Sequence, residues 1–126
     1  MTDLPALHAL IIEDDRNISI ILAEALKQAG FNVEVIHSPR HGLARLAEII
    51  PALITLDMHM PEYSGLDMLA AIRADPRLAA VPIYLITGDA IATEGVDEPG
   101  VTVLIKPVSF VKLRQKAAAL RATLMG

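Results

Sequence analysis

Apolar residues recur along the chain in five short runs, each rich in Ile, Val and Leu. Runs of this length without polar alternation are typical of strands buried on both faces, as in a parallel sheet. Between the runs, apolar residues are spaced three and four positions apart, which predicts helices. Strands that alternate with helices predict a doubly wound α/β sheet with right-handed crossovers. The predicted strands cover residues 8–13, 32–37, 52–57, 82–87 and 101–106.

Three of the segments between the runs, and the segment that follows the last run, have a clear apolar stripe. Ser38 and Ser109 are typical N-caps for two of these helices, and Gly30 is typical of the position just past a helix end. The third helix is expected over about residues 65–74. The predicted inward faces are Ile18, Ile21, Leu22, Ala25, Leu26 and Ala29; Leu43, Leu46, Ala47 and Ile50; Leu66, Leu69 and Ala70; and Phe110, Leu113, Ala117, Leu120 and Leu124.

One connection lacks a helical pattern. Residues 90–100 join the fourth and fifth predicted strands, yet they contain Gly95, Pro99 and Gly100 and have no apolar stripe. Glycine and proline are the residues least favourable in a helix. The helix expected in this connection is therefore predicted to be short, frayed or missing.

Length, charge and composition narrow the class of protein. The 126 residues, 53% of them hydrophobic, fit one compact domain. A net charge of −4 argues against direct binding to nucleic acid or to an anionic membrane. The absence of cysteine excludes disulfides and thiolate metal sites. No run approaches the roughly 18 apolar residues of a spanning helix and no signal peptide starts the chain, so a cytoplasmic protein is expected.

Polar residues stand at the ends of four predicted strands. Ligands of an open parallel sheet bind outside the carboxyl ends of its strands, so these residues are expected to share one rim. Singly, each has a plainer interpretation, and Asp15 is expected to be a helix N-cap. Together they predict an oxygen-ligand site for Mg²⁺, with one carboxylate acting as a nucleophile toward phosphorus. The residues are Glu13, Asp14 and Asp15, then Asp57, Thr87 and Lys106.

The order and spacing of these residues resemble the receiver domain of two-component response regulators. The motifs are Leu10-Ile-Ile-Glu-Asp-Asp15, Asp57-Met-His-Met-Pro61 followed by Gly65, Thr87-Gly88 and Lys106-Pro107. The resemblance covers essentially the whole chain. It implies a flavodoxin-like receiver fold, with five parallel strands in the order 2-1-3-4-5. The residue pattern of the connection over residues 90–100 predicts that the fourth helix of this fold is short or degenerate here. The resemblance also implies a single receiver domain over residues 1–126, with its core at about residues 7–124.

The resemblance assigns Asp57 as the phosphoacceptor, charged by a sensor histidine kinase or a phosphotransfer protein. Thr87 would hydrogen-bond the phosphoryl group, and Lys106 would pair with it. Lys106-Pro107 is expected to have a cis peptide bond. The implied Mg²⁺ ligands are Glu13, mainly through water, Asp14, Asp57 and the main-chain carbonyl of His59.

A phosphorylation-controlled signalling switch is the function that this resemblance implies. Such a switch catalyses only its own phosphorylation and dephosphorylation, and it acts through a downstream protein that the sequence does not identify. The sequence does not decide whether phosphorylation makes the protein form a dimer. The lack of a linker before Gly126 favours a free-standing regulator over a piece of a larger one.

Two departures from the family pattern concern signal output. Val103 stands where receivers usually have Tyr or Phe, three residues before the lysine, and the fourth helix is not convincing. Residues 90–100 are therefore expected to order or disorder on phosphorylation. His59 and Asp89 either flank the phosphoryl group or are solvated loop residues.

Two alternatives belong to other classes. A haloacid-dehalogenase-like, Mg²⁺-dependent phosphatase would place a second Asp two residues after its nucleophile, where this chain has His59. A degraded receiver would act as a phosphorylation-independent interaction module, but the complete set of polar strand-end residues argues against it.

The remaining histidines offer no convincing metal site; they are His8, His37 and His41. Two methionines, Met58 and Met60, are expected to pack in the core or in loops.

Overall fold

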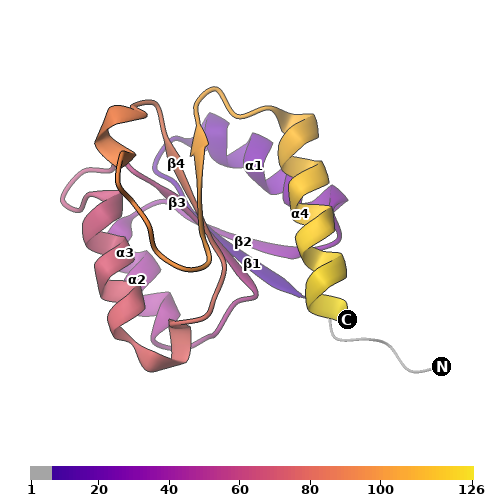
Figure 1. Cartoon of the computed structure of the whole chain (residues 1–126), viewed down its shortest axis with the longest axis horizontal. Helices are drawn as coiled ribbons and strands as arrows, with labels where there is room; N and C mark the ends of the chain where they lie inside the picture. The colour runs from indigo at the N-terminus through magenta and orange to yellow at the C-terminus, as the bar shows by residue number, and fades with distance from the viewer. Residues whose placement is uncertain (1–6) are drawn as a thin grey trace.

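A five-stranded parallel sheet lies at the centre of the computed structural model, which describes residues 7–126 (Figure 1). The strands lie in the order β2-β1-β3-β4-β5. This confirms the predicted fold class, and each predicted strand agrees with the observed one to within one residue at either end. The strands are β1 (His8–Ile12), β2 (Asn32–Ile36), β3 (Leu53–Asp57), β4 (Ile83–Thr87) and β5 (Val101–Ile105).

Three α-helices and two short 3-10 helices connect the strands within residues 7–126, and a fourth α-helix follows β5. The α-helices are α1 (Arg16–Gln28), α2 (Pro39–Leu46), α3 (Gly65–Ala74) and α4 (Phe110–Met125), and the 3-10 helices are η1 (Pro76–Leu78) and η2 (Ile91–Thr93). A side-chain oxygen caps each α-helix; Asp15, Ser38, Ser64 and Ser109 accept the backbone N–H groups. Asp15 is the N-cap of α1, which confirms the prediction. None of the helices in the described part of the chain has the length and apolar character needed to span a membrane.

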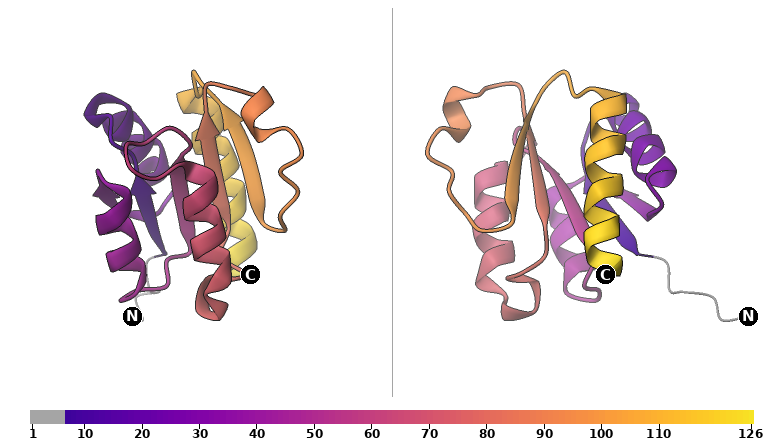
Figure 2. Two further views of the ribbon diagram at one scale, coloured as in Figure 1. Left: turned by 90° about the vertical axis from the view of Figure 1, so that its left-hand side faces the viewer. Right: turned by 45° about the vertical axis from the view of Figure 1, so that its right-hand side comes forward.

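The helices form two layers, one on each face of the sheet (Figure 2). Helices α1 and α4 pack on one face around Ile11 and Leu26, and α2 and α3 pack on the other around Leu10 and Ile72. Successive residues of β1 therefore point into different cores, as expected for a strand buried on both faces. The core on the α2 and α3 side includes the two methionines expected to pack there or in loops, Met58 and Met60.

Several side chains predicted to point inward are exposed instead. Ile21 of α1 is 50% exposed, and Leu124 near the end of α4 is also exposed. Ile50 is 58% exposed because α2 ends at Leu46, so that Ile50 lies beyond the helix. On α3, Leu66 and Ala70 are exposed.

The contact of Gly65 with the end of β3 explains the orientation of α3. A Cβ atom at Gly65 would lie 2.6 Å from the Cα of Met58, so this edge of the helix touches the sheet. Met68, Leu69 and Ile72 follow at helical spacing and are buried. The face of α3 that contacts the core therefore lies to one side of the predicted stripe.

The connection between β4 and β5 has no α-helix and contains only η2, a single 3-10 turn of three residues. This confirms the prediction of a short or missing helix. Residues 94–100 continue as an irregular segment, seen as a wide loop in Figure 2. Arg73 holds the end of this segment, since its guanidinium donates to the carbonyl oxygens of Leu78 and Val81, both at 2.9 Å, and of Pro99 at 3.1 Å.

Candidate functional site

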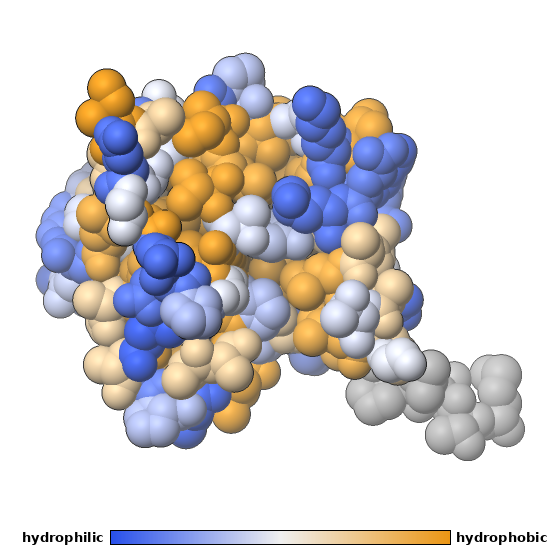
Figure 3. All heavy atoms as spheres, viewed as in Figure 1, coloured by the Kyte–Doolittle hydropathy of each residue, from blue (hydrophilic) through white to orange (hydrophobic). Residues whose placement is uncertain are grey.

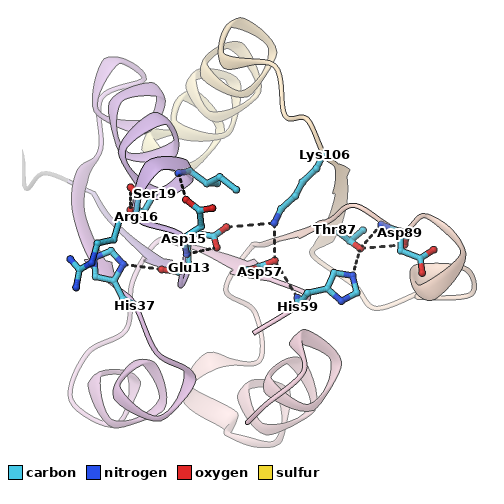
Figure 4. Close-up of polar contacts among 11 residues, drawn as sticks. Glu13, Asp15, Arg16, Ser19, His37, Asp57, His59, Thr87, Asp89 and Lys106 are labelled. Atoms are coloured by element: carbon cyan, nitrogen blue, oxygen red, sulfur yellow. Dashed lines mark hydrogen bonds and ion pairs between the residues drawn. The ribbon is translucent and has the colours of Figure 1, made fainter. Parts of the chain in front are cut away.

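The polar residues that end the strands meet at the carboxyl edge of the sheet (Figure 4). Glu13 follows β1, Asp57 ends β3, Thr87 ends β4 and Lys106 follows β5. Parallel strands place their carboxyl ends at one edge, which brings together residues far apart in the sequence. Glu13, Asp57 and Thr87 are all buried.

Three carboxylates form a tight cluster within this site. One oxygen atom from each of Glu13, Asp14 and Asp57 lies within 4.8 Å of the other two. Burial raises the pKa of Glu13 to about 8, a hydrogen bond from the Asp15 N–H opposes this rise, and the nearby charge of Asp57 adds to it. The cluster is therefore electrostatically unfavourable unless a cation compensates it.

The donor set of this cluster fits a divalent metal ion. Oε1 of Glu13 is buried without a hydrogen-bond partner, whereas Asp14 is exposed and leaves one side of the cluster open to water. Hard divalent cations prefer oxygen ligands and retain bound water. Within residues 7–126, no other group of three or more acidic or histidine side chains has its ligand atoms this close together.

Lys106 supplies the positive charge that the structure places nearest to the cluster. Its Nζ lies 3.2 Å from Oδ1 of Asp57 and 4.0 Å from Oε1 of Glu13. The Lys106–Pro107 peptide bond is cis, as the resemblance predicted. Lys106 thus pairs with the buried Asp57 while its side chain stays partly open to solvent.

Thr87 is hydrogen-bonded within the loops at this edge of the sheet. Its Oγ1 accepts the N–H of Asp89 at 2.9 Å and lies 3.3 Å from Nε2 of His59. Oδ1 of Asp89 accepts the N–H groups of Ile91 and Ala92 and so caps η2. Both His59 and Asp89, for which the sequence left two roles open, are exposed, yet they contact Thr87.

Two contacts of this site were not found from the sequence. The hydrogen bond between His59 and Thr87 joins two loops whose side-chain directions no periodic pattern encodes. His37, which the sequence analysis linked to no site, lies with Nδ1 2.9 Å from the carbonyl oxygen of Glu13. His37 therefore supports the backbone of a site residue, and no sequence signal pointed to this contact.

Glu13 is expected to make the stability of the metal-free protein depend on pH. The ordinary pKa of Glu13 is 4.5 and its folded-state pKa is about 8, so between these values the folded state holds a proton that the unfolded state has lost. The stabilisation from this proton is complete below pH 4.5 and is lost as pH rises to about 8, with a slope of at most about 1.4 kcal/mol per pH unit. Urea unfolding of the wild type and Glu13→Gln in a chelating buffer measures this difference.

The Glu13→Gln variant has no proton to lose at this position. Its free energy of unfolding should therefore lack this decline and exceed that of the wild type near pH 8. Parallel pH profiles for the two proteins would contradict the assignment of the raised pKa to Glu13.

Comparisons with known proteins agree with this geometry. A family profile for the response regulator receiver domain matches residues 9–118. A response regulatory protein from Vibrio cholerae is 30% identical over 110 residues, which cover 85% of this chain and 45% of that protein. The chain spans between a third and a half of the length of the first curated relatives that it matches.

Solved structures show the same architecture. A sensor protein from Polaromonas sp. JS666 has a TM-score of 0.83 at 26% identity, over 95% of this chain and 99% of that chain. The chemotaxis response regulator CheY4 of Vibrio cholerae has a TM-score of 0.81 at 21% identity, over 92% and 99% of the two chains. Both likenesses extend over nearly the full length of the solved chains.

Proposed function

Because this chain belongs to the family of response regulator receiver domains, we propose that it is a switch that accepts a phosphoryl group on Asp57. Receiver domains of this family serve two-component signalling. The observation that carries the proposal is the cluster of Glu13, Asp14 and Asp57 with the Lys106 ammonium 3.2 Å from Asp57. The proposal treats residues 1–126 as one receiver domain with its core at about residues 7–124.

Asp57 is the nucleophile in this proposal. A carboxylate oxygen of Asp57 attacks the phosphorus of a phosphohistidine, the P–N bond breaks, and the electron pair of that bond leaves with the imidazole of the donor. Glu13, Asp14, Asp57 and the main-chain carbonyl of His59 are the proposed Mg²⁺ ligands, and the ion would neutralise the charge of the phosphoryl oxygens. The orphaned Oε1 of Glu13 supports this ligand set.

Lys106 and Thr87 hold the transferred group in this proposal. Lys106 already pairs with Asp57, so its ammonium lies where negative charge increases on phosphorylation. The Thr87 hydroxyl donates to the Asp89 carbonyl oxygen at 3.2 Å, and it would exchange this acceptor for a phosphoryl oxygen. Such an exchange would disturb the turn that caps η2, which supports a response in residues 90–100.

The donor in this proposal is a sensor histidine kinase or a phosphotransfer protein, and the output is contact with another protein in the cytoplasm. No external metabolite is turned over. Val103 occupies the position of the usual aromatic residue, so signal transmission would depend on the loops around Thr87 instead. Neither nucleic acid nor a membrane is a direct partner in this proposal, and a phosphorylation-dependent dimer remains to be tested.

Acetyl phosphate provides the test. Incubation of the protein with acetyl phosphate and Mg²⁺ is expected to add one phosphoryl group per chain, measured by intact mass spectrometry, and excess chelator should prevent the addition. A chain that stays unmodified with Mg²⁺ present would favour the interaction module. Steady release of phosphate from small phosphomonoesters would favour the phosphatase.

A further inference from the structure

Helix α3 has an apolar stripe that no helix covers within residues 7–126. Leu66, Leu69 and Ala70 follow the spacing of one helix face; Leu69 is buried in the core, whereas Leu66 is 37% exposed and Ala70 is also exposed. The connection between β4 and β5 would normally place a helix on this face of the sheet, next to α3. In this chain that connection contributes η2, only three residues long.

A hollow of about 330 Å³ lies between this stripe and residues 95–98. Leu69 belongs to the core and Val96 is partly buried against it, so part of the lining of the hollow is apolar. The bond from Arg73 to the carbonyl oxygen of Pro99 ties the end of this wall to α3. The lining residues are Leu66, Leu69, Ala70, Gly95, Val96, Asp97 and Glu98.

The charge around the hollow is negative. Residues 89–98 include four acidic residues and neither Lys nor Arg, and Asp67 of α3 adds an exposed carboxylate. Arg73 is the nearby cation: its guanidinium donates to three carbonyl oxygens and its charge interacts with that of Glu98, so it offsets only part of this negative charge. Figure 3 shows hydrophilic and hydrophobic residues side by side on this face of the molecule. The four acids of the segment are Asp89, Glu94, Asp97 and Glu98.

We propose that this hollow binds a cationic amphipathic helix of a partner protein, which occupies the place of the missing crossover helix. An apolar groove that accepts one helix face is a recurrent mode of peptide recognition. Leu66, Ala70 and Val96 would contact the apolar face of the incoming helix. Lys or Arg side chains on its flanks would pair with Asp97 and Glu98, and an anionic helix would be repelled.

The segment between β4 and β5 is poorly suited to fill the hollow itself. Gly95 and Gly100 have φ values of +84° and +79°, which an α-helix does not accept, and Pro99 interrupts the segment. The docking site does not require phosphorylation, so it stands apart from the proposed function. The Asp57→Asn variant should still bind the helix.

The probe is a synthetic helical peptide of about four turns, with Leu at positions i, i+3, i+4 and i+7 and Lys on both flanks. A twin peptide carries Glu in place of each Lys. Titration of the isotope-labelled protein, followed by amide NMR, is expected to shift resonances of α3 and residues 89–98 with the Lys peptide only. Equal binding of the twins, or shifts confined to the carboxyl edge of the sheet or to α1, would overturn the proposal.

Charge-reversal variants distinguish this site from general attraction to an acidic protein. Asp97→Lys with Glu98→Lys should weaken binding of the Lys peptide by about tenfold. The matched control, Glu24→Lys with Glu48→Lys, makes the same change in net charge at exposed positions that do not line the hollow, and should change affinity less than about twofold. An equal loss in the two double variants would reject the site. Ala70→Arg, which leaves the acids in place, should also weaken binding of the Lys peptide.

Discussion

Asp57→Asn is expected to abolish phosphoryl uptake from acetyl phosphate, with no mass gain in conditions where the wild type is modified. The amide lacks the anionic oxygen that attacks phosphorus, and it also removes one of the three carboxylates of the proposed Mg²⁺ site. Asparagine has nearly the same shape as aspartate, so the substitution at this buried position leaves the shape of the site nearly unchanged. Intact mass spectrometry over a time course measures the loss.

Asp15→Asn is the matched control for this change. Asp15 lies two residues from Glu13 and is an exposed N-cap, with Oδ1 accepting the N–H of Ile18 at 3.0 Å. Asparagine caps helices as well as aspartate does, so both stability and phosphoryl uptake should stay near the wild-type values. A phosphoryl group on the Asp57→Asn protein would place the acceptor elsewhere, and equal loss in both variants would point to a general effect of charge.

The central strands could be predicted from the sequence because burial on both faces favours a run of apolar residues. β3 and β4 are buried at every position, and their runs of Ile, Leu and Thr leave few alternatives. The caps were equally local, since Asp15 and Ser109 each bond a backbone N–H three residues ahead. Features set by neighbouring residues in the chain were therefore accessible without the structure.

The rotation of each helix about its own axis was harder to predict from the sequence. The apolar pattern predicts the stripe with Leu66 and Ala70 as the buried face of α3, but contact between Gly65 and the end of β3 turns a neighbouring face toward the core. Ile50 was assigned to a helix that ends four residues earlier. Both errors depend on tertiary contacts that the apolar pattern alone does not encode.

The site residues could be found because the edge of a parallel sheet collects the carboxyl ends of its strands. From the sequence alone, this rule predicts that Glu13, Asp57 and Lys106 lie together. It says nothing about the directions of side chains in the loops. The contact of His59 with Thr87 and that of His37 with the backbone of Glu13 therefore required the structure.

The close approach of α3 to β3 makes Gly65→Ala the substitution with the largest expected effect on stability. The new Cβ would lie 2.6 Å from Cα of Met58 and 2.9 Å from the carbonyl oxygen of Asp57, both backbone atoms that no side-chain rotation moves aside. Helix and strand must separate, at an expected net loss of about 1–3 kcal/mol in the free energy of unfolding. Urea unfolding measures this loss.

Gly88→Ala is the control that separates collision from the general effect of adding a methyl group. Nothing lies within 4 Å of a Cβ at Gly88, so its stability should change by no more than about 0.5 kcal/mol. Because the collision at Gly65 involves the backbone of Asp57, Gly65→Ala should also slow phosphoryl uptake while the protein is still folded. Equal stability of the two alanine variants would show that α3 moves away from β3 freely, and the orientation of Asp57 would then not depend on this contact.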